Sequence, residues 1–336
     1  MPISASLRQD LGDVPLLGHG VAVSNPHTFI LDNAGWKRVD APQGVQAHCR
    51  PLWADESQQA QGMEGATAAG DSVMRGKQFW AELRSSEFSS LDPSSTIAIL
   101  PVAAIEQHGP HLPVMTDTAI AEGMIKTVLT RLASELEVLF LPIQMIGKSN
   151  EHLRSPGTIS YSAENLIRIW VEIGDSVHRA GLRKLVIVNS HGGNTDVIGI
   201  VARELRVRHN MLVATTQWRR FGLPPDIYSA FDATHGIHAG DIETSLMLHF
   251  RPDLVEMGKA KLFPSKAAEM EKDYKYLRPA GAHGFGWIAQ DLNADGAVGD
   301  ASAASAEKGR LTAEHQADGF IAFLRDVARF PLNELA

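Results

Sequence analysis

The sequence predicts an α/β fold in which a mostly parallel sheet is sandwiched between helices. Two observations lead to this prediction. Short apolar segments of strand length alternate along the chain with longer segments whose apolar residues recur at helical spacing. One short segment, KLVIVN at 184–189, has the consecutive apolar residues expected of a strand that is buried on both faces.

The regular alternation starts near residue 75. A strand is predicted where apolar residues run together over a short stretch, and a helix where they recur at every third or fourth position. Gly181 and Pro252 follow two of the predicted helices, as expected of residues that end a helix. In chain order, the predicted elements are a strand at 96–102, a helix at 116–134, a strand at 138–141, a helix at 163–180, a strand at 184–189, a helix at 194–208, a strand at 211–216, and helices at 242–249 and 313–330.

Composition limits the classes of function. With 336 residues, 44% of them hydrophobic, the chain is long enough to bury a large core. The net charge of −8 disfavours a nucleic-acid partner, because such a chain repels phosphate backbones. No apolar run is long enough to span a membrane, and the N-terminus lacks the pattern of a secretion signal. A single cysteine, Cys49, permits neither an internal disulfide nor a cysteine-based zinc site. We therefore expect a cytoplasmic enzyme.

Residues 1–73 differ from the rest of the chain. The segment 57–72 (SQQAQGMEGATAAGDS) is small and polar and has no apolar periodicity, which is typical of a linker or a disordered stretch. Residues 27–53 contain a few apolar anchors that could pack as an irregular arm. We predict an irregular or disordered extension over 1–73 and one domain over 74–336, and the alternative is that translation begins at Met74.

Candidate ligands follow the first predicted strand, in the run EQHGPHLPVMTD. Glu106 and His108 are two residues apart, so on an extended segment their side chains point the same way. Asp117 lies at the expected start of a helix. These side chains suit Zn²⁺ or Mn²⁺. Alternatively, Asp117 only caps the helix and Glu106 is a solvated charge.

Two later segments also bring histidines to strand or helix ends. In NSHGGN, His191 follows a strand and precedes two glycines, an arrangement that leaves its imidazole accessible, although a simple hydrogen-bonded histidine would fit as well. This segment lacks the pattern of a phosphate loop and of a serine nucleophile elbow. In HGIHAGDIETS, His238 and Glu243 flank an expected helix start. Because ligands bind beyond the carboxyl ends of parallel strands, we expect the segments to meet there.

The runs EQHGPHLPVMTD, NSHGGN and HAGDIETSLML, in this order, resemble the creatininase (creatinine amidohydrolase) family of metal-dependent amidohydrolases. FWAEL at 79–83 is similar to it as well, and the resemblance covers about residues 75–325. It implies a three-layer α/β/α amidohydrolase domain over 74–336 that binds two divalent ions per chain, Zn²⁺ or Mn²⁺ or both, with Fe²⁺ as a further possibility. It also implies a homo-oligomer, which by family analogy is a hexamer.

The resemblance also implies roles for individual residues. Creatininase has a glutamate where this chain has Gly193, so Glu243 is assigned as the fifth ligand and as a catalytic residue. His238 matches the family's proton-handling histidine. The implied ligands are Glu106 and His191 for one ion, His108 and Glu243 for the other, and Asp117 as the bridge. The implied substrate-binding residues are Gly192, Gly193, Trp218 and His235.

The implied reaction is the cleavage of a non-peptide C–N bond, in a cyclic amide or formamide, by a hydroxide that bridges the two metal ions. Trp218 matches one tryptophan that holds the flat ring of creatinine, but a second one is replaced around Thr234, which disfavours creatinine itself. Alternatives within the family are a formamidopyrimidine-nucleotide deformylase and a metallopeptidase that trims a small peptide. Arg219 and Arg220 would suit an anionic substrate or form surface ion pairs. An alternative of another class is a non-catalytic protein that binds a metal and a small molecule.

Overall fold

The computed structural model describes residues 28–32, 35–39 and 77–335. The chain divides into two units, Met1–Thr67 and Ala68–Ala336. In the first unit, β1 (Thr28–Asp32) and β2 (Gly35–Val39) pair as an antiparallel hairpin. The remainder of the predicted extension over 1–73, including segment 57–72, and the alternative start at Met74 lie outside the described residues.

The second unit contains the predicted parallel sheet. Its four strands lie in the order β4-β3-β5-β6, and every neighbouring pair is parallel. The pairing is in register at the strand starts, where Ile97 lies opposite both Val138 and Lys184. The strands are β3 (Ile97–Val102), β4 (Val138–Phe140), β5 (Lys184–Asn189) and β6 (Leu212–Gln217).

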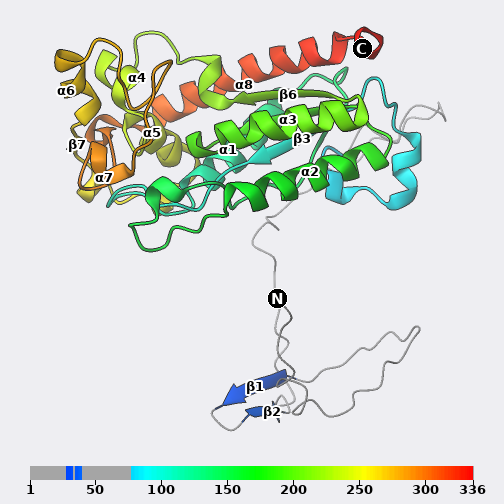
Figure 1. Ribbon diagram of the computed structural model, residues 1–336, viewed down its shortest axis with the longest axis horizontal. Coiled ribbons are helices and arrows are strands. Elements are labelled where there is room, and N and C mark those ends of the chain that lie inside the picture. Colours follow the sequence, from blue (N-terminus) through cyan, green and yellow to red (C-terminus); the bar gives the residue numbers. More distant parts are fainter. Residues whose placement is uncertain (1–27, 33–34, 40–76, 336) are drawn as a thin grey trace, which may run out of the picture. The chain divides into compact units, whose positions relative to one another are not determined.

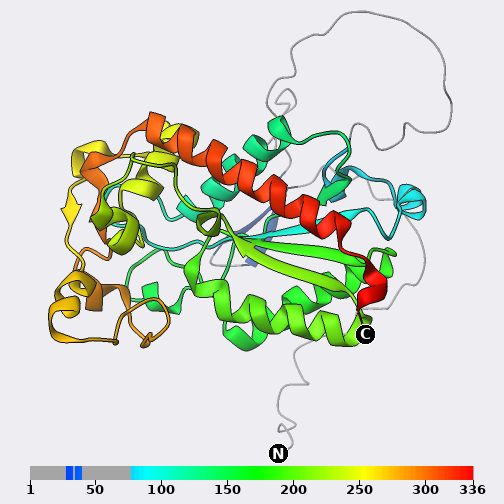
Figure 2. The same cartoon turned by 90° about the horizontal axis from the view of Figure 1, so that it is seen from above.

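Helices cover both faces of the sheet, so the predicted α/β class with a sheet sandwiched between helices is confirmed. Figure 2 shows α8 (Ala306–Arg329) running along one face, and α2 (Ala163–Arg179) and α3 (Thr195–His209) along the other. The helices α1 (Thr116–Arg131) and α5 (Asp241–Phe250) pack with α8.

Alternate residues of the strands enter two separate cores, as the two-residue period of a strand requires. Ile97 and Ile99 of β3 pack with residues of α1, α5 and α8. Ala98 and Leu100, on the opposite face of the same strand, pack with residues of α2 and α3. The consecutive apolar residues of the strands are therefore explained by burial on both sides.

Smaller elements that the sequence analysis did not predict lie in the segment between β6 and α8 (Figure 1). The pair β7–β8 is antiparallel. Among the described residues, no helix combines the length and the apolar character needed to cross a membrane. These elements are α4 (Ala230–His235), β7 (Leu262–Phe263), α6 (Lys266–Asp273), α7 (Ala289–Leu292) and β8 (Gly299–Asp300).

The last helix begins at Ala306 rather than at the predicted residue 313. Its first two turns contain Gly309, which weakens the helical pattern in the sequence. In the structure this glycine permits close contact between α8 and α5, since a Cβ added to Gly309 would lie 1.9 Å from the carbonyl oxygen of Ser245. Tertiary packing therefore determines where this helix starts.

We predict that Gly309→Ala lowers the free energy of unfolding by about 1–3 kcal/mol, because α8 must move away from α5. Gly199→Ala is the matched control, since Gly199 is a helical glycine of α3 around which a Cβ would meet nothing within 4 Å. The control should raise stability by about 0.4–1 kcal/mol. Urea-induced unfolding measures both values, and equal stability of the two variants would contradict the close packing of α8 on α5.

Candidate metal centre

The predicted ligands gather at the carboxyl ends of β3 and β5, the two central strands. The chain leaves β3 for α1 on one face of the sheet and leaves β5 for α3 on the other. Such a divergence is the usual ligand-binding crevice of a parallel sheet. The loop after β3 carries Glu106 and His108, and the loop after β5 carries His191. Asp117 and Glu243 come from the first turns of α1 and α5.

Asp117 lies at the middle of the group. Its Oδ2 is 3.5 Å from Nδ1 of His191, and its Oδ1 is 3.5 Å from Nε2 of His108. Two ligand atoms at about 2.1 Å from one tetrahedral zinc ion lie roughly 3.4 Å apart, so both distances suit shared coordination. Each oxygen of Asp117 therefore faces a different histidine, which is the arrangement that a bridging carboxylate needs.

One further carboxylate completes each half of the centre. Oε1 of Glu106 lies 3.1 Å from Nδ1 of His191, the histidine that faces Oδ2 of Asp117. Oε2 of Glu243 lies 3.8 Å from Nε2 of His108, the histidine that faces Oδ1 of Asp117. The structure thus brings together all five residues that the sequence analysis named as ligands.

Backbone carbonyls orient both ligand histidines. Nδ1 of His108 donates to the carbonyl oxygen of Glu106 at 3.0 Å, and Nε2 of His191 donates to the carbonyl oxygen of Lys148 at 2.8 Å. These bonds turn the other ring nitrogen of each histidine toward Asp117. Hydrogen bonding of the outward nitrogen is the usual way in which proteins fix a metal-binding imidazole.

The polar atoms at the centre are buried and lack hydrogen-bond partners. This holds for both carboxylate oxygens of Glu106, for Nε2 of His108 and for Oδ2 of Asp117. Leaving such atoms unpaired in a protein interior costs considerable free energy. The donor set of two imidazoles and three carboxylates is the one that divalent cations such as Zn²⁺ and Mn²⁺ accept. These residues fit the metal ions that the sequence analysis expected.

The pKa values at the centre reflect a shortage of positive charge. Burial disfavours the charged form of His108, yet Asp117 and Glu243 raise its pKa to about 9. Burial acts in the same direction on His191, and Glu106 overcomes it and raises the pKa to about 10. Burial raises the pKa of Asp117 to about 6 in spite of His108. Without a metal, protonated histidines must balance the buried carboxylates, and a divalent cation would take over this role.

A cavity of about 640 Å³ opens beside the centre. Trp218 lines it, with its Nε1 donating to Oγ of Ser190 at 3.1 Å. Its wall also includes Gly192, Gly193, His238 and Glu243, which the sequence analysis assigned to the site. His235 does not line this cavity. Its Nε2 instead faces Oε2 of Glu271 at 3.6 Å, so the structure does not bring His235 to the centre.

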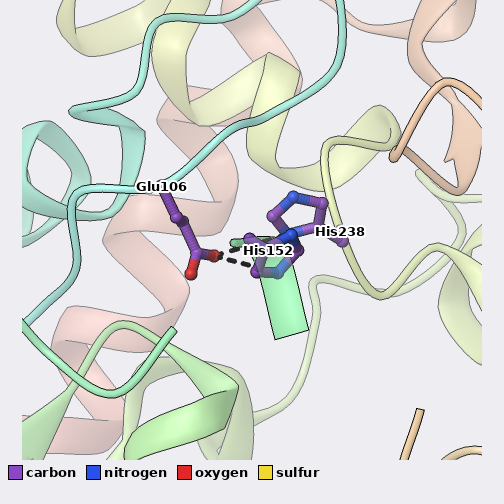
Figure 3. A group of neighbouring side chains, drawn as sticks. All are labelled: Glu106, His152 and His238. Atoms are coloured by element: carbon purple, nitrogen blue, oxygen red, sulfur yellow. Dashed lines mark ion pairs between the residues drawn. The ribbon is translucent and has the colours of Figure 1, made fainter. Parts of the chain in front are cut away.

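Two residues near the centre, Glu151 and His152, were missed by the sequence analysis. Both follow β4 and line the cavity. Figure 3 marks the contact between His152 and Glu106 with a dashed line. Nε2 of His152 lies 3.5 Å from Oε1 of Glu106, and Oε1 of Glu151 lies 3.5 Å from Nε2 of His191. The rule that directed attention to the ends of the other strands applies equally to β4. Applied to that strand, it would have indicated the segment SNEH at 149–152.

The surroundings of Gly193 leave no room for a side chain. A Cβ added there would lie 2.2 Å from the carbonyl oxygen of Lys148, 2.3 Å from Oε1 of Glu151 and 2.5 Å from Nε2 of His191. The carboxylate of Glu151 thus occupies the space into which a side chain at position 193 would point. The absence of a glutamate at 193 is therefore accompanied by a different carboxylate beside His191.

Comparison with known proteins identifies the family of the chain. A model of the creatininase family, described as creatinine amidohydrolase, matches residues 81–324. The chain belongs to the creatininase family. Within the described residues, histidine, glutamate and aspartate side chains form four overlapping groups that could hold a metal ion; Glu151 and Glu243 are half-buried and the other members are buried.

Curated relatives of this member of the creatininase family include mycofactocin precursor peptide peptidases. The protein from Mycobacterium tuberculosis (strain CDC 1551 / Oshkosh) is 38% identical over 177 residues, which are 51% of this chain and 65% of the relative, so the match spans slightly less than two thirds of that protein. The protein from Mycobacterium ulcerans is 33% identical over 68% of this chain and 84% of the relative. A creatinine amidohydrolase from Pseudomonas putida is 28% identical over 76% of this chain and 97% of the relative.

Solved structures of creatininases share the fold. A creatininase variant superimposes with a TM-score of 0.61 at 26% identity and covers 76% of this chain and all of its own. A structure named creatininase Mn gives a TM-score of 0.59 at 26% identity, and a creatininase variant of Zn-Zn type gives 0.60 at 27% identity, each covering 74% of this chain and 98% of its own. The solved relatives thus include manganese and dizinc forms.

We predict that Gly193→Ala displaces the Lys148 carbonyl and lowers the affinity for the ion bound by Glu106 and His191. The variant should lose this ion to a chelator, whereas the wild type keeps it. Gly192→Ala is the control, because a Cβ at Gly192 meets nothing within 4 Å and should leave the metal content unchanged. Metal analysis after dialysis against increasing chelator concentrations measures both. Equal retention by the two variants would contradict the steric role of Gly193.

Proposed function

We propose that the protein is a dinuclear metal-dependent hydrolase that cleaves an amide bond in a short peptide. The observation that carries the proposal is Asp117, whose two oxygens face the two ligand histidines, His108 and His191. This arrangement supports one ion on each side of a shared carboxylate. The similarity to mycofactocin precursor peptide peptidases supports a peptide, rather than a cyclic amide or formamide, as the substrate.

Five side chains of the centre would hold the ions. Glu106 and His191 would bind one ion, His108 and Glu243 the other, and Asp117 both. When bound, divalent ions supply Lewis acidity, which polarises a carbonyl group and lowers the pKa of water. The position of the centre at the cavity wall allows a peptide carbonyl to reach it.

His238 is placed to move protons between water and the leaving amine. Its Nε2 donates to the carbonyl oxygen of Gln107 at 2.8 Å, and its Nδ1 faces Oε1 of Glu106 at 3.7 Å. Burial and the nearby His108 lower the pKa of His238 to about 4, so the imidazole is neutral near pH 7 and Nδ1 can accept a proton. It can then deliver the proton to the departing nitrogen, a role that typically contributes about 10²–10⁴-fold to the rate.

The cavity lining combines apolar side chains with one fixed cation and the three carboxylates of Glu151, Asp196 and Glu243. Apolar side chains of Trp218, Phe285 and Trp287 line it. Among the residues that line it, Arg219 is the one arginine or lysine, and its guanidinium donates to the carbonyl oxygens of Gly236 and Ala233 at 3.0 and 2.8 Å. Because these bonds fix its position, Arg219 is suited to pair with a carboxylate of the substrate.

A non-peptide amide is the second candidate substrate. It is supported by the match to creatinine amidohydrolase along almost the whole of that relative, and by Trp218 at the cavity wall, where it can stack on a flat ring. A protein that binds metal and a small molecule without turnover is the third alternative, and the same experiment separates all three.

We expect the protein loaded with Zn²⁺ or Mn²⁺ to cleave short peptides, and we expect chelation to abolish cleavage because water and the carbonyl are no longer activated. Mass spectrometry of a panel of short peptides, cyclic amides and formamides measures this. Cleavage of cyclic amides or formamides alone would overturn the peptide assignment. Binding of panel members without any product would identify a binding protein.

We predict that Glu243→Gln reduces the metal content from two ions per chain to one and lowers peptide cleavage by about 100-fold or more, because one Lewis acid is lost. Glu204→Gln on the exposed side of α3 is the control and should leave both values unchanged. Metal analysis of the purified variants gives the ratio. Retention of both ions with full activity would show that Glu243 is not a ligand.

A further inference from the structure

Three buried histidine rings form a column beside Glu106. The ring centroids of His108 and His238 are 4.2 Å apart, and those of His238 and His152 are 4.3 Å apart. Figure 3 shows His238 and His152 side by side, facing Glu106. The function proposed above uses His108 and His238 but leaves His152 without a role. Gln107 contacts both His238 and His152, so its hydrogen bonds decide what these rings present to Glu106.

The side-chain amide of Gln107 has one possible orientation. Its Oε1 accepts from the backbone N–H of Gly109 at 2.9 Å, and its Nε2 donates to the carbonyl oxygen of Gly296 at 2.7 Å. A flipped amide would set its oxygen against the carbonyl oxygen of Gly296, which is also an acceptor, and its NH₂ group against the N–H of Gly109, which is also a donor. Neither pair can form a hydrogen bond. Gly296 leaves room for the amide, because a Cβ there would lie 2.7 Å from Oε1 of Gln107.

This orientation determines the tautomer of His152. The second hydrogen of Gln107 Nε2 points to Nδ1 of His152 at 2.8 Å, so Nδ1 must accept. A neutral His152 therefore carries its hydrogen on Nε2, the atom that lies 3.5 Å from Oε1 of Glu106. His152 thus directs an N–H donor at the carboxylate.

The backbone of Gln107 determines the tautomer of His238. Its carbonyl oxygen can only accept, so Nε2 of His238, at 2.8 Å, carries the hydrogen. The longer 3.3 Å contact between this nitrogen and Nε2 of Gln107 stays unbonded, because both amide hydrogens are already used. The unprotonated Nδ1 of His238 then faces Oε1 of Glu106 at 3.7 Å.

We propose that Gln107 is a positioning residue that holds His238 and His152 in the same Nε2–H tautomer while they turn opposite edges toward Glu106. One ring then presents a proton acceptor and the other an N–H donor at the same oxygen. His152 orients the carboxylate of Glu106, and His238 remains free to accept a proton. The catalytic consequence rests on the proposed hydrolase function, whereas the tautomers do not.

The substitution Gln107→Glu tests this proposal, because a carboxylate at position 107 can accept from His152 but cannot donate to it. In the Zn²⁺-loaded protein, ¹⁵N–¹H spectra of the imidazoles should show the hydrogen of His152 on Nε2 in the wild type and on Nδ1 in the variant. His238 should keep its hydrogen on Nε2 in both, since its partner is a backbone carbonyl. The His152→Leu spectrum assigns the His152 signals. A general loss of structure would not move the ring hydrogen of His152 to Nδ1 while leaving the ring hydrogen of His238 on Nε2.

Kinetics provides the second readout. With zinc content unchanged, Gln107→Glu should lower kcat for peptide cleavage by about 10–100-fold and leave KM nearly unchanged. His152→Gln, which returns an amide N–H near the position of Nε2, should keep at least tenfold more activity than His152→Leu. The control Gln290→Glu changes a half-buried amide that donates to Ser155 and should have no effect.

Several results would overturn the inference: a wild-type His152 protonated on Nδ1, an unchanged tautomer in Gln107→Glu, or a kcat for His152→Leu equal to that of the wild type. If Gln107→Glu does not fold, Gln107→Met removes the same donor without adding a charge, and the wild-type spectrum still decides the tautomers. If the wild type cleaves no amide, the proposed function fails while the tautomer measurement remains informative.

Discussion

Buried negative charge is the constraint on which this site depends. Glu106 and Asp117 lie almost fully inside the protein, and their oxygens find little hydrogen bonding there. Carboxylates in such surroundings need positive charge within a few ångströms. The neighbouring imidazoles supply it only when protonated, whereas divalent ions would supply it at any pH at which the histidines can bind them. This requirement accounts for the convergence of side chains from three other segments on Asp117, which faces both histidines.

The fold meets this requirement through the divergence of two adjacent strands. Because β3 and β5 send their following helices to opposite faces of the sheet, the loops at their carboxyl ends face each other across a crevice. Helices α1 and α5 then point their first turns, which carry Asp117 and Glu243, into the same space. The position of α5 depends in turn on α8, whose Gly309 lets the two helices approach closely. Packing between α5 and α8 thus helps to set the position of a proposed ligand.

The loop after β4 contributes two side chains, Glu151 and His152, to the immediate surroundings of the centre. Its Glu151 fills the space that a side chain at Gly193 would need, and its His152 stacks on His238. The same loop contributes to the wall of a cavity that also contains tryptophans and one fixed arginine. These are the features on which the proposed peptide substrate rests.

The sequence by itself determined the α/β class and the four parallel strands, because burial on two faces is a local pattern. Its strand-end motifs, together with the family resemblance that they carry, named Asp117 and the four residues that gather around it. It did not determine the start of α8, which depends on contact with Ser245, or the distance of His235 from the cavity, which follows from its pairing with Glu271. The strand-end rule can indicate the segment that carries Glu151 and His152, but only the tertiary structure shows that both side chains reach the centre. A loop carries no periodicity, and only the packed molecule shows which distant side chains it meets.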